Sequence, residues 1–181
     1  MAENFYNIDD FSNAKKIFKR LTNYGGAFKW HANKQIAKIL IQEENKSKSL
    51  QLLGTSYNEI KNQGVYYTFD YAEFLKNNEE FNEAIIYYSK ILNNIDKKHP
   101  LFPEATDGRG VAYERIGKWE EAEKDLLDSL EASPDQAYVI NYLAYSWIEK
   151  GMKIQQSLEM LEKANKLKSN DPFIIDSLGW A

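Results

Sequence analysis

The chain has 181 residues, of which 43% are hydrophobic and 28% charged, and its formal net charge is −4. This length allows a substantial core, and the slight negative charge argues against non-specific nucleic-acid binding, which needs a basic surface. The absence of cysteine excludes disulfides, thiolate catalysis and cysteine-ligated metal sites.

Apolar residues at intervals of three and four positions predict a chain made of helices. Glycine, proline and polar turns separate the predicted helices, so the expected fold class is all-α. In chain order the predicted helices are 10–21, 29–43, 46–61, 65–77, 80–94, 103–116, 119–131, 137–150, 154–168 and 172–181.

Small residues recur in these helices at a nearly constant period. Ala37, Ala72, Gly110, Ala144 and Gly179 follow one another at intervals of 35, 38, 34 and 35 residues. A fixed period of this length is typical of repeat proteins, in which each unit buries its apolar face against the next. The longest interval contains an additional loop, HPLF at 99–102.

The segment 103–136 carries the most complete pattern. A glycine lies in the turn between its helices and opens the phrase GKWEEA at 117–122. The pattern positions are Gly110, then Tyr113 three residues later, Ala122 twelve later, Leu126 sixteen later and Pro134 twenty-four later. This arrangement resembles the tetratricopeptide repeat (TPR), a helix–turn–helix unit of about 34 residues.

The resemblance implies an α-solenoid, a right-handed superhelix of TPR helix–turn–helix repeats, and a single TPR domain over 1–181. The repeat at 30–64 lacks the turn glycine, and Thr68, Thr106 and Ile140 stand where the family has a tryptophan. An ordinary helical bundle is the alternative, but it does not require small residues at fixed offsets. The expected units are a half-repeat at 1–29, repeats at about 30–64, 65–102, 103–136 and 137–171, and a truncated half-repeat at 172–181.

The helix 137–150 carries two apolar stripes where an ordinary surface helix needs one. The first stripe is Ile140, Leu143, Ala144 and Trp147, which we expect to pack against neighbouring helices. The second stripe is Tyr138, Tyr142 and Tyr145. We expect it to face a concave groove without a packing role, because an unpacked apolar stripe suits a surface that binds a ligand. Packing of these tyrosines on another repeat is the alternative.

The groove positions of the family can be carried onto the first helix of each repeat. This step predicts four sets of side chains on the concave surface. The sets are Lys34 and Lys38 with His31 and Gln35; Tyr66, Phe69, Asp70 and Glu73; Glu104 and Asp107 with Glu114 and Arg115; and Tyr138, Asn141, Tyr142 and Tyr145, followed by Phe173 and Asp176.

These residues favour a protein or peptide ligand that is basic and carries aromatic or apolar anchors, because the middle sets are acidic and aromatic. The first set is positive, so a ligand with asymmetric charge would dock in one direction. Some TPR domains clamp a C-terminal carboxylate with lysine, asparagine and arginine. Acidic residues such as Asp70 and Asp107 stand in the middle sets here, so we do not expect binding to chaperone C-terminal tails.

Three functions follow from the pattern. The first is a non-enzymatic protein–protein interaction scaffold that binds its partner in the groove. The second is an assembly or regulatory subunit that self-associates at its exposed ends, without a groove ligand. The third is a helical-repeat enzyme that uses groove acids such as Asp107 on a sugar or a peptide.

The motifs of enzymes and metal sites are weak. The only histidines, His31 and His99, have no metal-site spacing, and DGRG at 107–110 lacks the residues of a phosphate loop. We therefore expect no catalytic residue, no metal and no cofactor. No apolar run reaches the length of about 18 residues that a membrane span needs, and the first residues, MAENFYNIDD, do not resemble a signal peptide.

The last residues, DSLGWA, fall within a first helix that has no second helix to cover it. We expect either a longer repeat protein or contacts with another copy, and exposed apolar ends favour homo-oligomers. The final segment resembles long bacterial TPR proteins, many of which are exported or lipid-anchored. The resemblance implies a bacterial source, with the cytoplasm and the cell envelope or periplasm as alternative locations.

Overall fold

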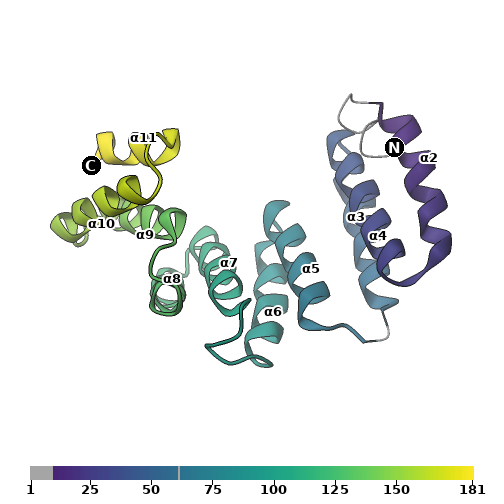
Figure 1. The fold of residues 1–181 in the computed structure, drawn as a ribbon, viewed down its shortest axis with the longest axis horizontal. Helices are drawn as coiled ribbons and strands as arrows, with labels where there is room; N and C mark the ends of the chain where they lie inside the picture. The colour runs from purple at the N-terminus through teal and green to yellow at the C-terminus, as the bar shows by residue number, and fades with distance from the viewer. Residues whose placement is uncertain (1–9, 61) are drawn as a thin grey trace. The chain divides into compact units, whose positions relative to one another are not determined.

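The computed structural model describes residues 10–60 and 62–181, in which every regular element is a helix (Figure 1). The chain folds as two compact units, Met1–Glu80 and Phe81–Ala181. The first unit contains α2 (Phe11–Leu21), the short 3-10 helix η1 (Thr22–Tyr24), α3 (Gly26–Gln42), α4 (Lys46–Asn58) and α5 (Val65–Asn77). The second contains α6 (Phe81–Leu92), α7 (Phe102–Arg115), α8 (Trp119–Ala132), α9 (Ala137–Glu149), α10 (Ile154–Leu167) and α11 (Pro172–Trp180).

The ten predicted helices are confirmed, with two ends shifted by three residues and the other ends within two residues of the predicted bounds. Helix α3 begins at Gly26 instead of 29, because Gly25 at φ 71° ends the 3-10 helix and its carbonyl accepts the amide of Lys29 at 3.1 Å. Helix α4 ends at Asn58 instead of 61. The Gln63 side chain donates to the Tyr57 carbonyl at 2.9 Å and so satisfies one acceptor at that end.

The same backbone turn ends the first helix of four successive hairpins. Its left-handed residue is Glu44, Glu79, Gly117 or Gly151, with φ of 58°, 65°, 79° and 66°. The amide that follows each of these residues donates to the carbonyl five positions earlier, at 2.8 to 2.9 Å. The turns recur with the repeat period, and the first two form without the glycine that the sequence pattern provides in the later two.

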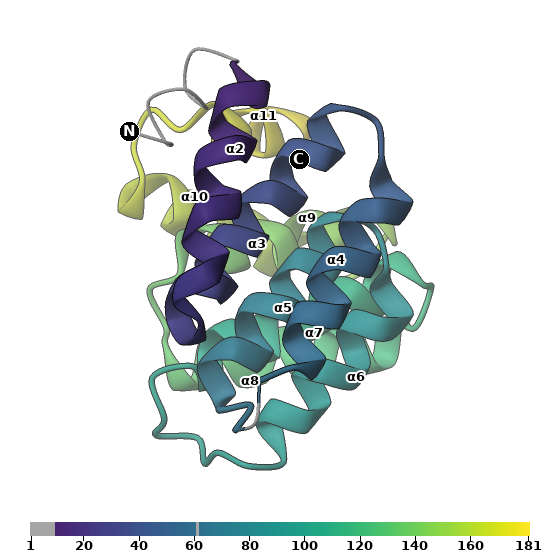
Figure 2. The same cartoon turned by 90° about the vertical axis from the view of Figure 1, so that its right-hand side faces the viewer.

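The first unit packs α2 against α3, and these helices lie side by side in both views (Figures 1 and 2). Phe18 of α2 is buried among Ile36 and Ile39 of α3. Helix α4 crosses α3 closely at Ser49, whose hydroxyl donates to the Ala37 carbonyl at 2.6 Å. Between α4 and α5, the Tyr57 and Tyr71 rings stack with centroids 4.8 Å apart.

The second unit stacks its helices around small residues, as the sequence predicts. Most of the predicted small and large positions are buried, although Gly179 of α11 is exposed. Glycines in α7 let α6 and α8 approach. A Cβ at Gly108 would lie 2.6 Å from the Tyr88 ring, and one at Gly110 would lie 3.1 Å from Leu126 Cγ. Side chains with zero exposure are Ala37 and Ala72 of the first unit and Ala122, Leu126 and Ala144 of the second, together with Ala84, Tyr88 and Leu161 at the corresponding positions of the neighbouring repeats.

A buried ion pair joins three helices of the second unit. Arg109 of α7 donates to both carboxylate oxygens of Asp125 of α8, at 2.6 and 2.8 Å, and to the Ser89 hydroxyl of α6 at 3.1 Å. Asp125 is almost fully buried. A paired, two-pronged contact of this kind fixes the register of the helices that it joins.

Candidate functional site

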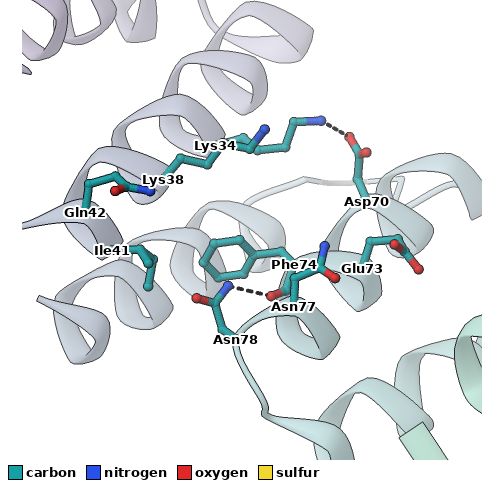
Figure 3. Close-up of a pocket in the computed structure, with 9 residues that line it drawn as sticks. All are labelled: Lys34, Lys38, Ile41, Gln42, Asp70, Glu73, Phe74, Asn77 and Asn78. Carbon is teal, nitrogen blue, oxygen red and sulfur yellow. Dashed lines mark hydrogen bonds and ion pairs between the residues drawn. The ribbon is translucent and has the colours of Figure 1, made fainter. Parts of the chain in front are cut away.

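A pocket of about 340 Å³ lies between α3 and α5 of the first unit (Figure 3). Lys34, Lys38 and Ile41 occupy neighbouring positions on one face of α3, because residues three and four apart lie above one another on a helix. The facing helix contributes Asp70, Glu73 and other residues. The lining residues are Lys34, Lys38, Ile41, Gln42, Asp70, Glu73, Phe74, Asn77 and Asn78. Four side chains predicted for the groove, from two different sets, therefore line one pocket.

The charges in this pocket are partly neutralised by its own ion pairs. The Lys34 ammonium lies 2.7 Å from Asp70 Oδ2 (Figure 3). The same oxygen accepts the Trp30 indole N–H at 3.0 Å. Lys76 donates to Glu73 at 2.8 Å. Lys38 is exposed and has no ion-pair partner among the residues that the structure describes. The pocket therefore presents one uncompensated ammonium group above the apolar side chains of Ile41 and Phe74.

The two aromatic residues predicted for this set do not line the pocket. Tyr66 and Phe69 lie earlier on α5; Tyr66 is exposed and Phe69 is half-buried. They were grouped with Asp70 and Glu73 because the groove positions of the tetratricopeptide family were carried onto this helix. The structure separates them because only the second half of α5 faces the pocket. Gln42, Asn77 and Asn78 were not predicted, and their amides carried no signal in the repeat pattern.

In the second unit, Tyr142 has a packing role that the expected unpacked stripe does not include. Its hydroxyl donates to Glu114 Oε2 of α7 at 2.8 Å, and its ring packs against the cluster around Leu126 and Trp147. Burial, together with this hydrogen bond, raises the pKa of Tyr142 above its ordinary value. The expectation of an unpacked side chain is therefore wrong for Tyr142, which links α9 to α7. The buried stripe of Ile140, Leu143, Ala144 and Trp147 is confirmed.

Tyr138 and Tyr145 are more accessible. Tyr138 is 52% exposed, its hydroxyl donates to Asp171 Oδ2 at 2.8 Å, and Lys168 Nζ lies 4.2 Å from its ring centroid. Tyr145 lies half-buried at the edge of a second pocket, of about 500 Å³, between α9 and α11. The other lining residues of this α9–α11 pocket are Ile175, Asp176, Gly179 and Trp180.

The remaining predicted residues are spread over α7 and α9. Glu104 is exposed and Asp107 is half-buried on α7, and neither lines a described pocket with the tyrosines. Asn141 is half-buried, and its Oδ1 is buried without a hydrogen-bond partner in the described part of the chain. Buried polar atoms without a partner are rare in folded proteins.

The described residues form no group of three or more histidine, cysteine, aspartate or glutamate side chains that could hold a metal ion. His99 Nδ1 accepts the Leu101 amide at 3.1 Å, and the His31 ring contacts Phe18 edge-on with centroids 6.4 Å apart. Within the same residues, the helices are too short or too polar to cross a bilayer.

No family model matches the chain. A curated TPR repeat-containing protein of Pseudomonas aeruginosa is 26% identical over 142 residues, which cover 78% of this chain and 23% of that protein. The chain thus matches less than a quarter of that relative's length.

Solved TPR structures have the same fold. MamA from Desulfovibrio magneticus RS-1 superposes with a TM-score of 0.69 at 11% identity, over 94% of this chain and 93% of that one. YrrB, described as a TPR protein with an unusual peptide-binding site, superposes with a TM-score of 0.62 at 13% identity, over 97% of this chain and 87% of that one. The expected resemblance and the all-α solenoid fold class are confirmed.

Proposed function

Because the chain has the tetratricopeptide-repeat fold, we propose that it is a non-enzymatic scaffold that binds a peptide or protein segment on the first helices of its repeats. One observation carries this proposal. The pocket between α3 and α5 gathers Lys34, Lys38, Asp70 and Glu73, four side chains that the family's groove positions assign to the ligand surface. A pocket with a few polar groups above apolar side chains is the common form of a binding site.

The chemistry of each unit indicates the ligand that it suits. In the first unit, Lys38 and the amides of Gln42 and Asn77 offer donors to a polar or acidic group of a peptide. In the second unit, Glu104 and Asp107 favour basic residues. YrrB, which has this fold, is described as binding a peptide, and this description supports the same use of the fold here.

The proposal can be tested by selecting binders from a displayed library of random peptides with the whole chain as bait. Dissociation constants of the selected peptides are then measured by fluorescence anisotropy. We expect Lys38→Gln to weaken binding about fivefold, the size of one lost charge-assisted hydrogen bond of about 1 kcal/mol at an exposed site. Lys48→Gln is the matched control, because Lys48 is exposed on α4 and does not line the pocket.

Two outcomes would reject this function: no peptide enriched above background, or enriched peptides that bind the Lys38→Gln and wild-type chains equally. Turnover of a peptide or sugar that Asp107→Ala abolishes would favour the enzyme instead.

An assembly or regulatory subunit is the second candidate. The exposed apolar side chains of α11 favour it: Phe173 is 75% exposed, and Ile175 and Trp180 are also exposed. Such a subunit would self-associate through these side chains without a groove ligand. Light scattering over a range of concentrations separates the two candidates. A mass that rises with concentration and falls in Phe173→Ser, together with no selected peptide, would favour assembly.

A further inference from the structure

The second unit contains an aromatic ring, a carboxylate and a lysine arranged as one group. Lys153 Nζ lies 4.0 Å from the Trp147 ring centroid and 2.7 Å from Glu123 Oε1. The Trp147 indole N–H donates to the same Glu123 oxygen at 2.7 Å. The ammonium is therefore attracted by the ring face and by the carboxylate together.

A second group of the same composition lies where α10 leads into α11. Lys168 Nζ lies 4.2 Å from the Tyr138 ring centroid, and the Tyr138 hydroxyl donates to Asp171 at 2.8 Å. The hydrogen bond from Tyr138 lowers the pKa of Asp171. This aspartate also caps α11, since its side chain accepts the amides of Phe173 and Ile174.

The α9–α11 pocket is lined by two rings and one carboxylate, and a second carboxylate lies beside its Tyr145. Tyr145 and Trp180 line it, and Trp180 is 69% exposed. Asp176 lines the pocket. Glu149, one helical turn after Tyr145, interacts with the Tyr145 hydroxyl and is the largest cause of the raised pKa of Tyr145, to which Asp176 contributes less. No lysine or arginine lines the pocket, and neither carboxylate forms an ion pair with any residue in 10–60 or 62–181.

We propose that the α9–α11 pocket binds the cationic side chain of a lysine or arginine on a protein partner. Tyr145 and Trp180 place aromatic rings at the pocket, and Asp176, with Glu149 at the Tyr145 hydroxyl, supplies opposite charge. Rings and carboxylates also surround Lys153 and Lys168 elsewhere in this unit. Ile175 supplies an apolar surface for the methylene stem of the cationic side chain. The existence of a protein partner for this pocket rests on the proposed scaffold function. The chemistry of the pocket can be tested without such a partner.

The test titrates the chain with Nα-acetyl-lysine methylamide and Nα-acetyl-arginine methylamide, with Nα-acetyl-norleucine methylamide as the neutral control. The readout is the indole ¹H–¹⁵N NMR signal of Trp180, assigned through Trp180→Phe. We expect saturable shifts with both cationic probes and binding about fivefold weaker for norleucine. Added salt should weaken only the cationic probes, because the attraction is electrostatic and exposed.

Variants identify the pocket residues. Asp176→Asn, on the exposed face of α11, should weaken binding of the cationic probes about fivefold and leave the norleucine probe unchanged. Tyr145→Phe should retain binding of the cationic probes, because it keeps the ring, whereas Tyr145→Ala should lose it. Glu162→Gln, which removes an exposed carboxylate of α10 outside the pocket, is the matched control. Circular dichroism checks that each variant is folded.

Equal binding of norleucine and the cationic probes would overturn the inference, and so would an Asp176→Asn variant that binds as the wild type does. Failure of the scaffold function would give a different result from failure of the pocket assignment. If no displayed peptide is selected but the cationic probes bind, the pocket assignment stands and the scaffold fails. If selected peptides bind but neither cationic probe shifts the Trp180 signal, the scaffold stands and the pocket assignment fails.

Discussion

The Lys34 ammonium and the Asp70 carboxylate form an ion pair of 2.7 Å between the first helices of two successive repeats. The two residues are 36 positions apart, about one repeat, so the pair links equivalent faces of α3 and α5. Asp70 also accepts the indole N–H of the buried Trp30. One carboxylate therefore neutralises a pocket lysine and satisfies a buried donor.

Two substitutions of Asp70 should separate these roles. Asp70→Asn keeps an acceptor for Trp30 and removes only the partly exposed ion pair, so the free energy of unfolding should fall by about 0.2–1 kcal/mol, and by less at high salt. Asp70→Ala also leaves the indole N–H unpaired and should lower the free energy of unfolding by a further ~1–3 kcal/mol. Urea unfolding at low and high salt measures both. Equal losses in the two variants would refute the bridging role.

Gly108 of α7 lies directly against the Tyr88 ring of α6. An alanine Cβ there would lie 2.6 Å from the ring of Tyr88, which is fully buried and cannot move aside without disturbing its neighbours. Gly108→Ala should therefore lower the free energy of unfolding by about 1–3 kcal/mol, as overpacked cores do. Thermal and urea unfolding measure the loss. In Gly179→Ala, the helical control with no atom within 4 Å of the new Cβ, stability should stay the same or rise.

Glu44 and Glu79 hold the left-handed turn position that Gly117 and Gly151 hold in the later hairpins. The left-handed conformation costs a residue with a Cβ about 1–2 kcal/mol, while glycine loses about 0.5–1 kcal/mol through the entropy of the unfolded chain. The first effect is larger, so Glu44→Gly and Glu79→Gly should each raise the free energy of unfolding by up to about 1 kcal/mol. Gly117→Ala should lower it. A destabilised Glu→Gly variant in urea unfolding would contradict this account of the turn.

Glu123 should contribute to the acid sensitivity of the second unit. Its pKa is lowered because Lys153 donates a hydrogen bond to the carboxylate, an effect that partial burial opposes and the Trp147 indole N–H reinforces. A lowered folded pKa means that the unfolded state binds protons first. The stabilisation is therefore complete above the ordinary value of 4.5 and is lost as the pH falls through the lower folded pKa.

The corresponding experiment measures the free energy of unfolding between pH 6 and 3, a window of about three units around the carboxylate range. Glu123→Gln should show a shallower decline with falling pH than the wild type. Glu162→Gln, which removes an exposed carboxyl of α10 with no ion-pair partner in the described residues, should leave the slope unchanged. A wild-type slope in the Glu123 variant would mean that the Lys153 contact does not persist in solution.

Much of the fold can be predicted from the sequence, because its determinants are local. Helix α9 shows this clearly: Ile140, Leu143 and Trp147 recur at the helical period and are buried as that period requires. The crossing points follow from small residues such as Gly110 and Ala122, which leave room for Leu126. The turns at Glu44 and Glu79 could not be predicted, because glycine was the expected signal and the hydrogen bonds form without it.

The sequence by itself determined the repeat period, the helices and the faces that they bury, because each depends on residues a few positions apart. Only the tertiary structure decided which polar side chains meet. It paired Lys34 with Asp70 and left Lys38 uncompensated. It joined Tyr142 to Glu114 and Lys153 to Glu123, and set Lys168 over the Tyr138 ring, while the Tyr145 pocket received no cation from the described chain. Contacts between residues about thirty positions apart depend on how the long side chains of adjacent hairpins pack, and helical periodicity does not predict that packing.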